Sequence, residues 1–136
     1  MTRPPSGGTP PPTESRLPDG RVVDLAEPAA ETCRRYAKRF PDEEARYGEA
    51  WMPWCRHDTQ HLINWSVLDL AGFGDLDAQV DWLWRVLAAR GFPVERIPVN
   101  LELAASVMRE RGEGDVGDRL ARAAVRLAGK QDDDAR

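Results

Sequence analysis

The central helical pattern of the chain is WCRHDTQHLINWSVLDLA, which occupies residues 54–71. At about 100° per residue, this sequence places its large apolar side chains on one broad face of a helix. The pattern stops at Gly72-Phe73-Gly74, where closely spaced glycines are typical of a helix end followed by a turn. With one residue from the preceding turn, the apolar face consists of Trp51, Trp54, Leu62, Trp65 and Leu68.

Helical periodicity also extends to both sides of this segment. Asp75 and Asn100 are good N-cap residues, and Gly112, Gly114 and Gly117 favour a loose hinge before the last helix. Short connections favour antiparallel neighbours. The sequence therefore predicts an all-α fold, a compact bundle of five or six helices. Besides the central one, the predicted helices cover 27–40, a short stretch from 42 past 47, 76–89, 100–111 and 118–128.

The two ends of the chain have a different composition from the middle. Residues 1–20 hold more than half of the prolines, which predicts a disordered Pro-rich tail. A short strand-like entry, Arg21-Val22-Val23, follows the tail. The predicted organisation is a tail over 1–20, one helical domain over 21–129 and an acidic C-terminal tail over 130–136.

Composition limits the class of protein. With 136 residues and 41% apolar residues, the chain is long enough for one domain with a real core. A net charge of -4 argues against nucleic acid as a partner, since phosphate binding requires a basic face. No apolar run approaches about 18 residues, so no membrane span is predicted. No signal peptide is visible, which predicts a cytoplasmic protein.

Two further features of composition are informative. All basic residues except Lys38 and Lys130 are arginines, which suggests a bacterial genome of high GC content. The two cysteines, Cys33 and Cys55, are too few for a disulfide framework. In a reducing compartment both are expected to be thiols.

One polar group interrupts the tryptophan-rich face of the central helix. Asp58 and His61 fall in the middle of this face, and His57 lies at its edge. A carboxylate directed at an aromatic core needs a partner, because burying an unpaired charge is costly. His61, three residues after Asp58, is the local candidate; a backbone N–H or an arginine from another helix would serve as well. The predicted ligand-binding residues are Trp54, Asp58, His61 and Trp65.

The two histidines allow other interpretations. The spacing of His57 and His61 would let both chelate a metal from one helix face, with a third ligand from elsewhere. Alternatively, His61 could be an axial ligand of a tetrapyrrole packed among tryptophans. In the simplest interpretation, Asp58 and His61 form a structural pair and no cofactor is bound.

The tryptophans of the 76–89 helix suggest an interface. Trp82 and Trp84 lie two residues apart and cannot both face one core. At least one is expected at a rim or at an interface with a partner protein or a second copy. In the alternative, helices on both sides bury each ring.

Several spaced positions between residues 47 and 108 carry a family resemblance. They are Tyr47-Gly48, Cys55 with Asp58, His61, Trp82 and Arg90-Gly91-Phe92-Pro93. This pattern resembles the helical domains that precede cobalamin-binding domains in bacterial regulatory proteins. The chain lacks the D-x-H-x-x-G loop that supplies the lower cobalt ligand in such proteins. The resemblance therefore implies a helical sensory or regulatory module that acts as a free-standing protein.

The sequence as a whole favours a non-catalytic regulatory or sensor module that binds a partner protein or a small ligand near the central helix. The alternative is a metal- or tetrapyrrole-binding protein that uses His57 and His61. No nucleophile motif, P-loop or dinucleotide fingerprint is present to favour an enzyme.

Overall fold

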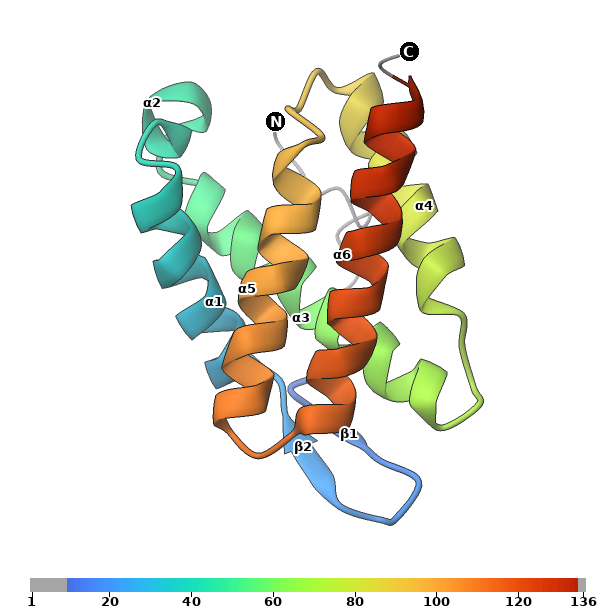
Figure 1. The fold of residues 1–136 in the computed structure, drawn as a ribbon. Helices are drawn as coiled ribbons and strands as arrows, with labels where there is room; N and C mark the ends of the chain where they lie inside the picture. The colour runs from blue at the N-terminus through green and yellow to red at the C-terminus, as the bar shows by residue number, and fades with distance from the viewer. Residues whose placement is uncertain (1–9, 135–136) are drawn as a thin grey trace.

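The structure is a computed structural model that describes residues 10–134, with side chains through Lys130. Within these residues the fold consists of six helices and one small antiparallel sheet (Figure 1), which confirms the predicted all-α bundle. No helix in the described part of the chain has the length and apolar character needed to cross a membrane. The elements are β1 (Glu14–Arg16), β2 (Val22–Asp24), α1 (Ala26–Arg39), α2 (Glu43–Tyr47), α3 (Trp51–Leu70), α4 (Leu76–Ala89), α5 (Arg96–Glu110) and α6 (Gly114–Asp134).

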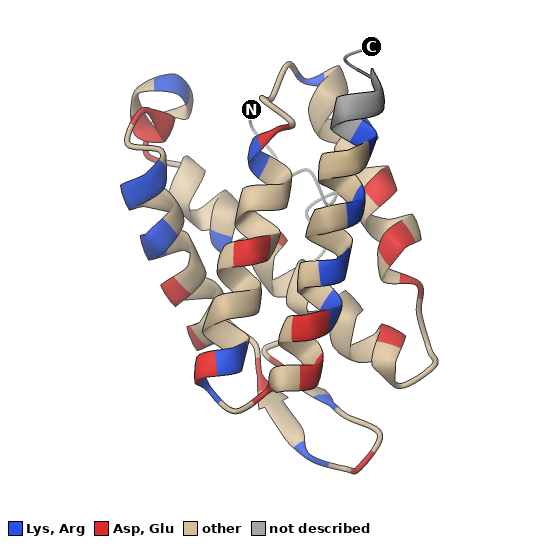
Figure 2. Ribbon diagram, viewed as in Figure 1, with Lys and Arg blue, Asp and Glu red and all other residues tan. Residues whose placement is uncertain are grey.

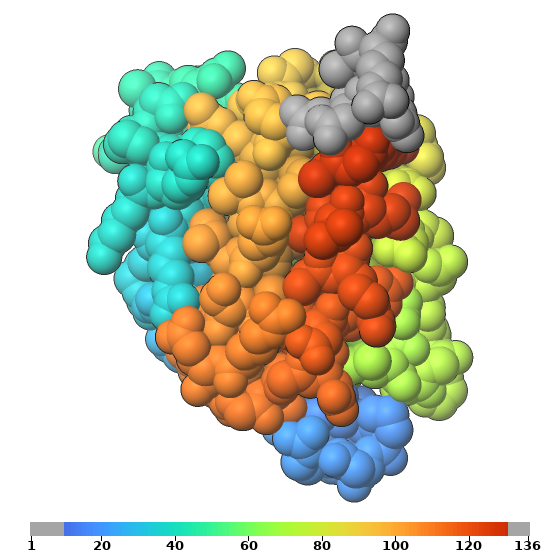
Figure 3. Space-filling view, in the orientation of Figure 1, coloured from blue at the N-terminus to red at the C-terminus, as the bar shows by residue number. Residues whose placement is uncertain are grey.

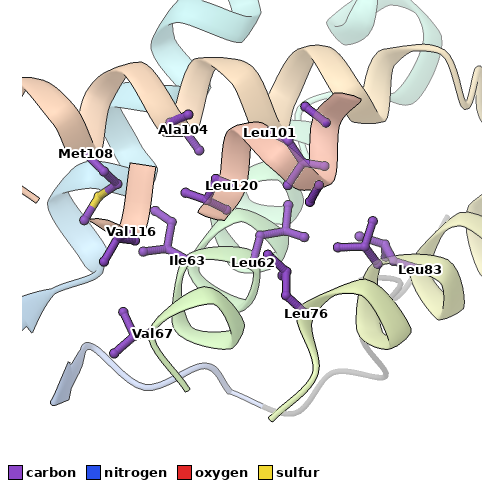
Figure 4. Close-up of a cluster of buried hydrophobic side chains, with 14 of the residues drawn as sticks. Leu62, Ile63, Val67, Leu76, Leu83, Leu101, Ala104, Met108, Val116 and Leu120 are labelled. Atoms are coloured by element: carbon purple, nitrogen blue, oxygen red, sulfur yellow. The ribbon is translucent and has the colours of Figure 1, made fainter. Parts of the chain in front are cut away.

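Helix α3 is the centre of the packing. It contacts α1, α2, α4, α5, α6 and β1, and α5 and α6 lie side by side in front of it (Figure 1). The close-up in Figure 4 shows Leu62, Ile63 and Val67 of α3 directed at α5 and α6. All three are buried because neighbouring elements cover α3 on several sides. Their partners in this core include Leu76, Leu83, Leu101, Ala104, Met108, Val116 and Leu120.

Local sequence signals account for the position of α4. Asp75 precedes the helix in an extended conformation, and its side chain accepts a hydrogen bond from the Ala78 amide at 3.1 Å. This satisfies one of the backbone donors that every helix start leaves open. The predicted helix over 76–89 and its cap are therefore confirmed.

The N-terminal prediction needs a correction. Residues 1–9 lie outside the described residues, but Glu14–Arg16 pairs with Val22–Asp24 as a hairpin. Leu17 and Val23 are buried in the core, and Gly20 takes the turn at φ 90°. From composition alone, the first strand of this hairpin is predicted as part of the disordered tail. In the structure the hairpin is ordered, because two of its apolar side chains are buried in the core. In Figure 3 the hairpin projects at the lower edge of the molecule.

The C-terminal boundaries also differ from the prediction. Helix α6 runs from Gly114 to Asp134, so most of the predicted acidic tail continues the helix, and residues 135–136 lie outside the described residues. The predicted glycine hinge is confined to Gly112, at φ 81°. Gly117 is instead a packing residue. A Cβ added there would lie 2.8 Å from the carbonyl oxygen of Ala105, so its hydrogen side chain permits the close contact between α5 and α6.

The cysteines are likewise not thiols. Cys33 of α1 and Cys55 of α3 form a disulfide, with their Cα atoms 6.1 Å apart. This Cα separation lies within the usual range for disulfides. Sequence spacing could not show this, because the pairing depends on α1 packing against α3. The cytoplasmic location stays a prediction.

We predict that Gly117→Ala destabilises the protein by about 1–3 kcal/mol, since the added methyl must push α5 and α6 apart. Gly129→Ala is the matched control: it lies on the same helix, and an added Cβ there meets nothing within 4 Å. The control should be stabilised by about 0.5–1 kcal/mol through helix propensity. Urea unfolding of both variants tests this, and equal midpoints would show that the two helices do not approach closely at Gly117.

We predict that reduction lowers the free energy of unfolding by about 3 kcal/mol, because the disulfide closes a loop with a sequence separation of 22. Unfolding is measured with and without dithiothreitol, and thiols are titrated in denaturant before reduction. A Cys33→Ala/Cys55→Ala variant should not respond to the reductant. Two titratable thiols in the untreated protein would contradict the disulfide.

Candidate functional site

A pocket lined by aromatic side chains lies where α1, α2, α3, α4 and α5 meet. It is open to solvent and has a cavity volume of about 80 Å³. We call it the aromatic pocket. Five rings line it: Tyr36, Tyr47, Trp51, Trp54 and Phe92. The aliphatic lining residues are Leu62, Leu83, Leu87 and Ile97, and the polar ones are Glu43, Cys55, Asp58, Arg96 and Asn100.

The rings come from distant parts of the chain. Tyr36 of α1 packs against Trp51 of α3 with ring centroids 6.2 Å apart. Tyr47, at the end of α2, stacks on Phe92 of the α4–α5 connection at 5.9 Å. Aromatic pairs at these separations are attractive beyond the area they bury. The two pairs therefore help to hold α1, α2 and the α4–α5 connection around one space.

A buried ion pair forms part of the pocket wall. Glu43 is 3% exposed and accepts hydrogen bonds from the Arg96 guanidinium and, at 3.2 Å, from the Tyr36 hydroxyl. Nη2 of Arg96 also contacts the carboxylate of Asp42 at 2.9 Å. The guanidinium lies 4.3 Å from the centre of the Phe40 ring, at cation–π distance. This cluster joins α2 to the first turn of α5.

Burial is the largest single influence on the pKa values of Glu43, Tyr36 and Arg96. It raises the pKa of Glu43 above its ordinary value, although Arg96 and Tyr36 act in the opposite direction. Burial, together with the charge of Glu43, also raises the pKa of Tyr36. Burial alone would lower the pKa of Arg96, but hydrogen bonds to Asp42 and Glu43 raise it overall, so the guanidinium stays charged.

Asn100 differs most from its predicted role. Helix α5 begins at Arg96, so Asn100 lies inside the helix instead of capping it, and its side chain reaches α3. Its Nδ2 donates to Oγ1 of Thr59 at 3.2 Å. Its Oδ1 is buried and has no hydrogen-bond partner within residues 10–130. Asn100 is also one of the residues that line the pocket.

The disulfide explains the orientation of this amide. Oγ1 of Thr59 lies 3.6 Å from Sγ of Cys33 and 3.9 Å from Sγ of Cys55. Disulfide sulfurs carry no proton, so in these contacts the hydroxyl must donate to sulfur. The hydroxyl oxygen then accepts from Asn100, which requires Nδ2 on that side. Oδ1 is consequently the atom left over.

The structure divides the four residues predicted to bind a ligand. Trp54 and Asp58 line the aromatic pocket. His61 and Trp65 line a different depression on α3, together with Pro12. The His61 and Trp65 rings stack with centroids 5.5 Å apart. The four side chains thus belong to two places, because a helix twenty residues long presents successive turns to different neighbours.

The histidines lie close to each other on α3. Their ring centroids are 4.9 Å apart in an edge arrangement, and Nδ1 of His57 lies 3.3 Å from Oδ1 of Asp58. Within the described residues, no group of three or more His, Cys, Asp or Glu side chains is placed to hold a metal ion. A metal or tetrapyrrole at His57 and His61 stays a prediction, and neither histidine lines the aromatic pocket.

The two tryptophans of α4 have different environments. Trp82 is 37% exposed, whereas Trp84 is buried with the Lys130 ammonium 5.8 Å from its ring centre. An interface at these residues stays a prediction.

Acidic and basic residues are interspersed along the helices of the bundle (Figure 2). Arg119 and Arg126 of α6 contact Asp77, and Arg126 also contacts Asp81 of α4 at 2.9 Å. Arg35 of α1 pairs with Glu110 of α5 at 2.7 Å. These pairs mix both signs across the surface and lie outside the aromatic pocket.

Comparisons with known proteins add no functional assignment. No protein-family model, no curated protein and no solved structure matches this chain.

Local sequence patterns indicate only part of the pocket. Trp54 and Asp58 were predicted from the helical pattern of α3, but the Glu43–Arg96 pair was not. Glu43 and Arg96 are 53 residues apart, and no local pattern links them. The sequence predicts Tyr47 as a helix residue and Asn100 as a cap, and Phe92 enters only as part of the family resemblance.

We predict that Arg96→Leu destabilises the protein by about 3–5 kcal/mol at neutral pH, because it leaves the Glu43 carboxylate buried without its cation. The raised pKa of Glu43 sets the sign of the pH dependence. Protonated Glu43 needs no counter-charge, so the variant is most stable below the ordinary glutamate pKa of about 4.3 and loses stability as pH rises through the folded-state pKa.

The control for this experiment is the double variant Glu43→Gln/Arg96→Leu. It should recover part of the lost stability and show no such pH slope between about pH 4 and about pH 8. Urea unfolding across this range measures both effects. A flat profile for Arg96→Leu would contradict the coupling of the two residues.

Proposed function

We propose that this chain is a non-catalytic regulatory or sensor module that binds a small organic ligand in the aromatic pocket. The observation that carries the proposal is an open pocket lined by five aromatic rings, four aliphatic side chains and a few polar ones. Mostly apolar walls with a few convergent polar groups are typical of small-molecule sites.

The position of the pocket supports a regulatory role. Its wall includes Tyr47 of α2, a helix of only five residues, and Asn100 of α5. A ligand between them would link this short helix to the main bundle. If the ligand favours one position of α2, it shifts the population of that position, which a partner protein can then recognise. The resemblance to helical domains of bacterial regulators favours the same role.

The experiment is a ligand-observed NMR screen with small organic molecules of one or two rings, including cations, neutral molecules and anions. We predict hits whose signals are lost in Trp54→Ala, which removes one aromatic wall of the pocket. Trp82→Ala is the matched control, since it removes a ring from α4 outside the pocket. Both tryptophans retain some exposure, so both variants should fold.

Two results would contradict the proposal. In one, no molecule of the screen binds the wild-type protein. In the other, binding survives Trp54→Ala and is lost in Trp82→Ala, which would place the site on α4.

A further inference from the structure

We propose that Cys55 is a site of thiol–disulfide exchange, at which a low-molecular-weight thiol displaces Cys33 and stays attached in the aromatic pocket. This modification goes beyond the proposed function, because it is covalent and does not require that the pocket hold a noncovalent ligand. Three observations support it: the two cysteines differ in burial, the pocket beside Cys55 is small, and Thr59 contacts the disulfide.

The two cysteines of the disulfide differ in their access to solvent. Cys33 of α1 has no exposed surface, whereas Cys55 of α3 is only partly buried. Cys55 is also one of the residues that line the aromatic pocket, which is open to solvent, and Cys33 is not. The position of attack on a disulfide depends on which of its sulfurs a thiol can reach. A thiol in solution is therefore expected to approach through the pocket and to attack at Cys55.

The exchange replaces one disulfide with another. The thiolate of the small molecule attacks Sγ of Cys55, and a new S–S bond forms there while the bond between Cys55 and Cys33 breaks. The electron pair of the broken bond leaves with Sγ of Cys33 as a thiolate, which then takes up a proton from water. One thiol is consumed and one is released, so the small thiol is the only reagent needed. Cys33 stays close to Cys55, with a Cα separation of 6.1 Å in the disulfide, so it can attack Cys55 in turn and reverse the reaction.

Thr59 is placed to stabilise the departing sulfur. Its Oγ1 lies 3.6 Å from Sγ of Cys33, and its hydroxyl donates to sulfur in this contact. A charged sulfur in a buried position is costly unless a hydrogen bond compensates it. The hydroxyl of Thr59 lowers this cost for the thiolate of Cys33, and a stabilised thiolate leaves faster. Thr59 is thus expected to accelerate the exchange.

The pocket limits the size of the thiol. Its cavity volume is about 80 Å³, which suits a molecule of few non-hydrogen atoms. Trp51, Trp54 and Leu62 of α3 line it together with Cys55, so a short apolar chain attached to Cys55 gains by leaving water. Glutathione, a tripeptide, would have to keep most of its atoms outside the pocket. A short thiol such as cysteamine is the better probe.

The first experiment locates the adduct in the wild-type protein. The oxidised protein is incubated briefly with cysteamine at neutral pH, and excess N-ethylmaleimide in denaturant then traps the free thiols. Peptide mass spectrometry should find cysteamine on Cys55 and maleimide on Cys33 in most singly modified molecules. Attack on unfolded protein would place cysteamine on both cysteines alike, so the position of the adduct identifies the route.

Cys33→Ala and Cys55→Ala are a matched pair of variants, because both lose the same disulfide and each keeps one thiol. The probe is cystamine, the disulfide of cysteamine. Cys55 in the first variant should form the mixed disulfide at least about tenfold faster than Cys33 in the second, because Cys55 lines the pocket and Cys33 is buried. The rates of both thiols in denaturant provide the correction for intrinsic reactivity.

Two comparisons test the pocket and Thr59. Relative to their rates in denaturant, glutathione should attack the native disulfide at least about tenfold more slowly than cysteamine. Thr59→Val should slow the attack of cysteamine several-fold, because it removes the hydroxyl that stabilises the leaving sulfur. Thr59→Ser keeps the hydroxyl and should stay near the wild-type rate.

Several results would overturn the proposal. They are an adduct mainly on Cys33, an equal distribution over both cysteines, equal rates in the two single-cysteine variants, and no adduct on native protein under conditions that modify it in denaturant. Equal relative rates for glutathione and cysteamine would show that the pocket is not the route. None of these results bears on noncovalent binding in the NMR screen, and a screen without hits would leave the exchange at Cys55 standing.

Discussion

The constraint on which the structure depends is the burial of α3. Every helix of the bundle and the first strand contact it, so its side chains are divided among several neighbours instead of facing one core. Leu62, Ile63 and Val67 serve the contact with α5 and α6, while Trp51 and Trp54 at its start line the pocket. A helix buried in this way cannot shift without disturbing the other elements. Its position is held by these neighbours, and several of its side chains line the pocket.

A continuous series of polar contacts connects α1, α3 and α5 beside the pocket. The disulfide joins α1 to α3, Thr59 donates to its sulfurs, and Asn100 of α5 donates to Thr59. Among residues 10–130, this sequence of contacts leaves Oδ1 of Asn100 without a hydrogen-bond partner. On the other side, the Glu43–Arg96 pair attaches α2 to α5. Contacts that stabilise the bundle thus also position polar side chains in the wall of the pocket.

How far the sequence predicted the protein can be judged from particular elements. The α4 helix and its Asp75 cap were predicted at their observed bounds, because a cap, an apolar stripe and a closing glycine are all local signals. The hairpin was missed, since three-residue strands carry too little periodicity and Pro-rich flanks suggest a tail. Asn100 was predicted as a cap because asparagine favours that position. The helix instead begins at Arg96, whose partner Asp42 is distant in the sequence.

By itself, the sequence determined the helical fold class and the central position of the tryptophan-rich helix. It also determined that polar side chains lie among the aromatic residues of this helix. These follow from periodicity and from the cost of burying charge, both of which act locally. Only the tertiary structure decided which of those polar groups share a site. It separated Trp54 and Asp58 from His61 and Trp65, paired Cys33 with Cys55, and brought Glu43, Arg96 and Asn100 to one pocket. The physical reason is that these relations depend on which faces of α1, α2, α3 and α5 come together, and packing of the whole chain determines those contacts.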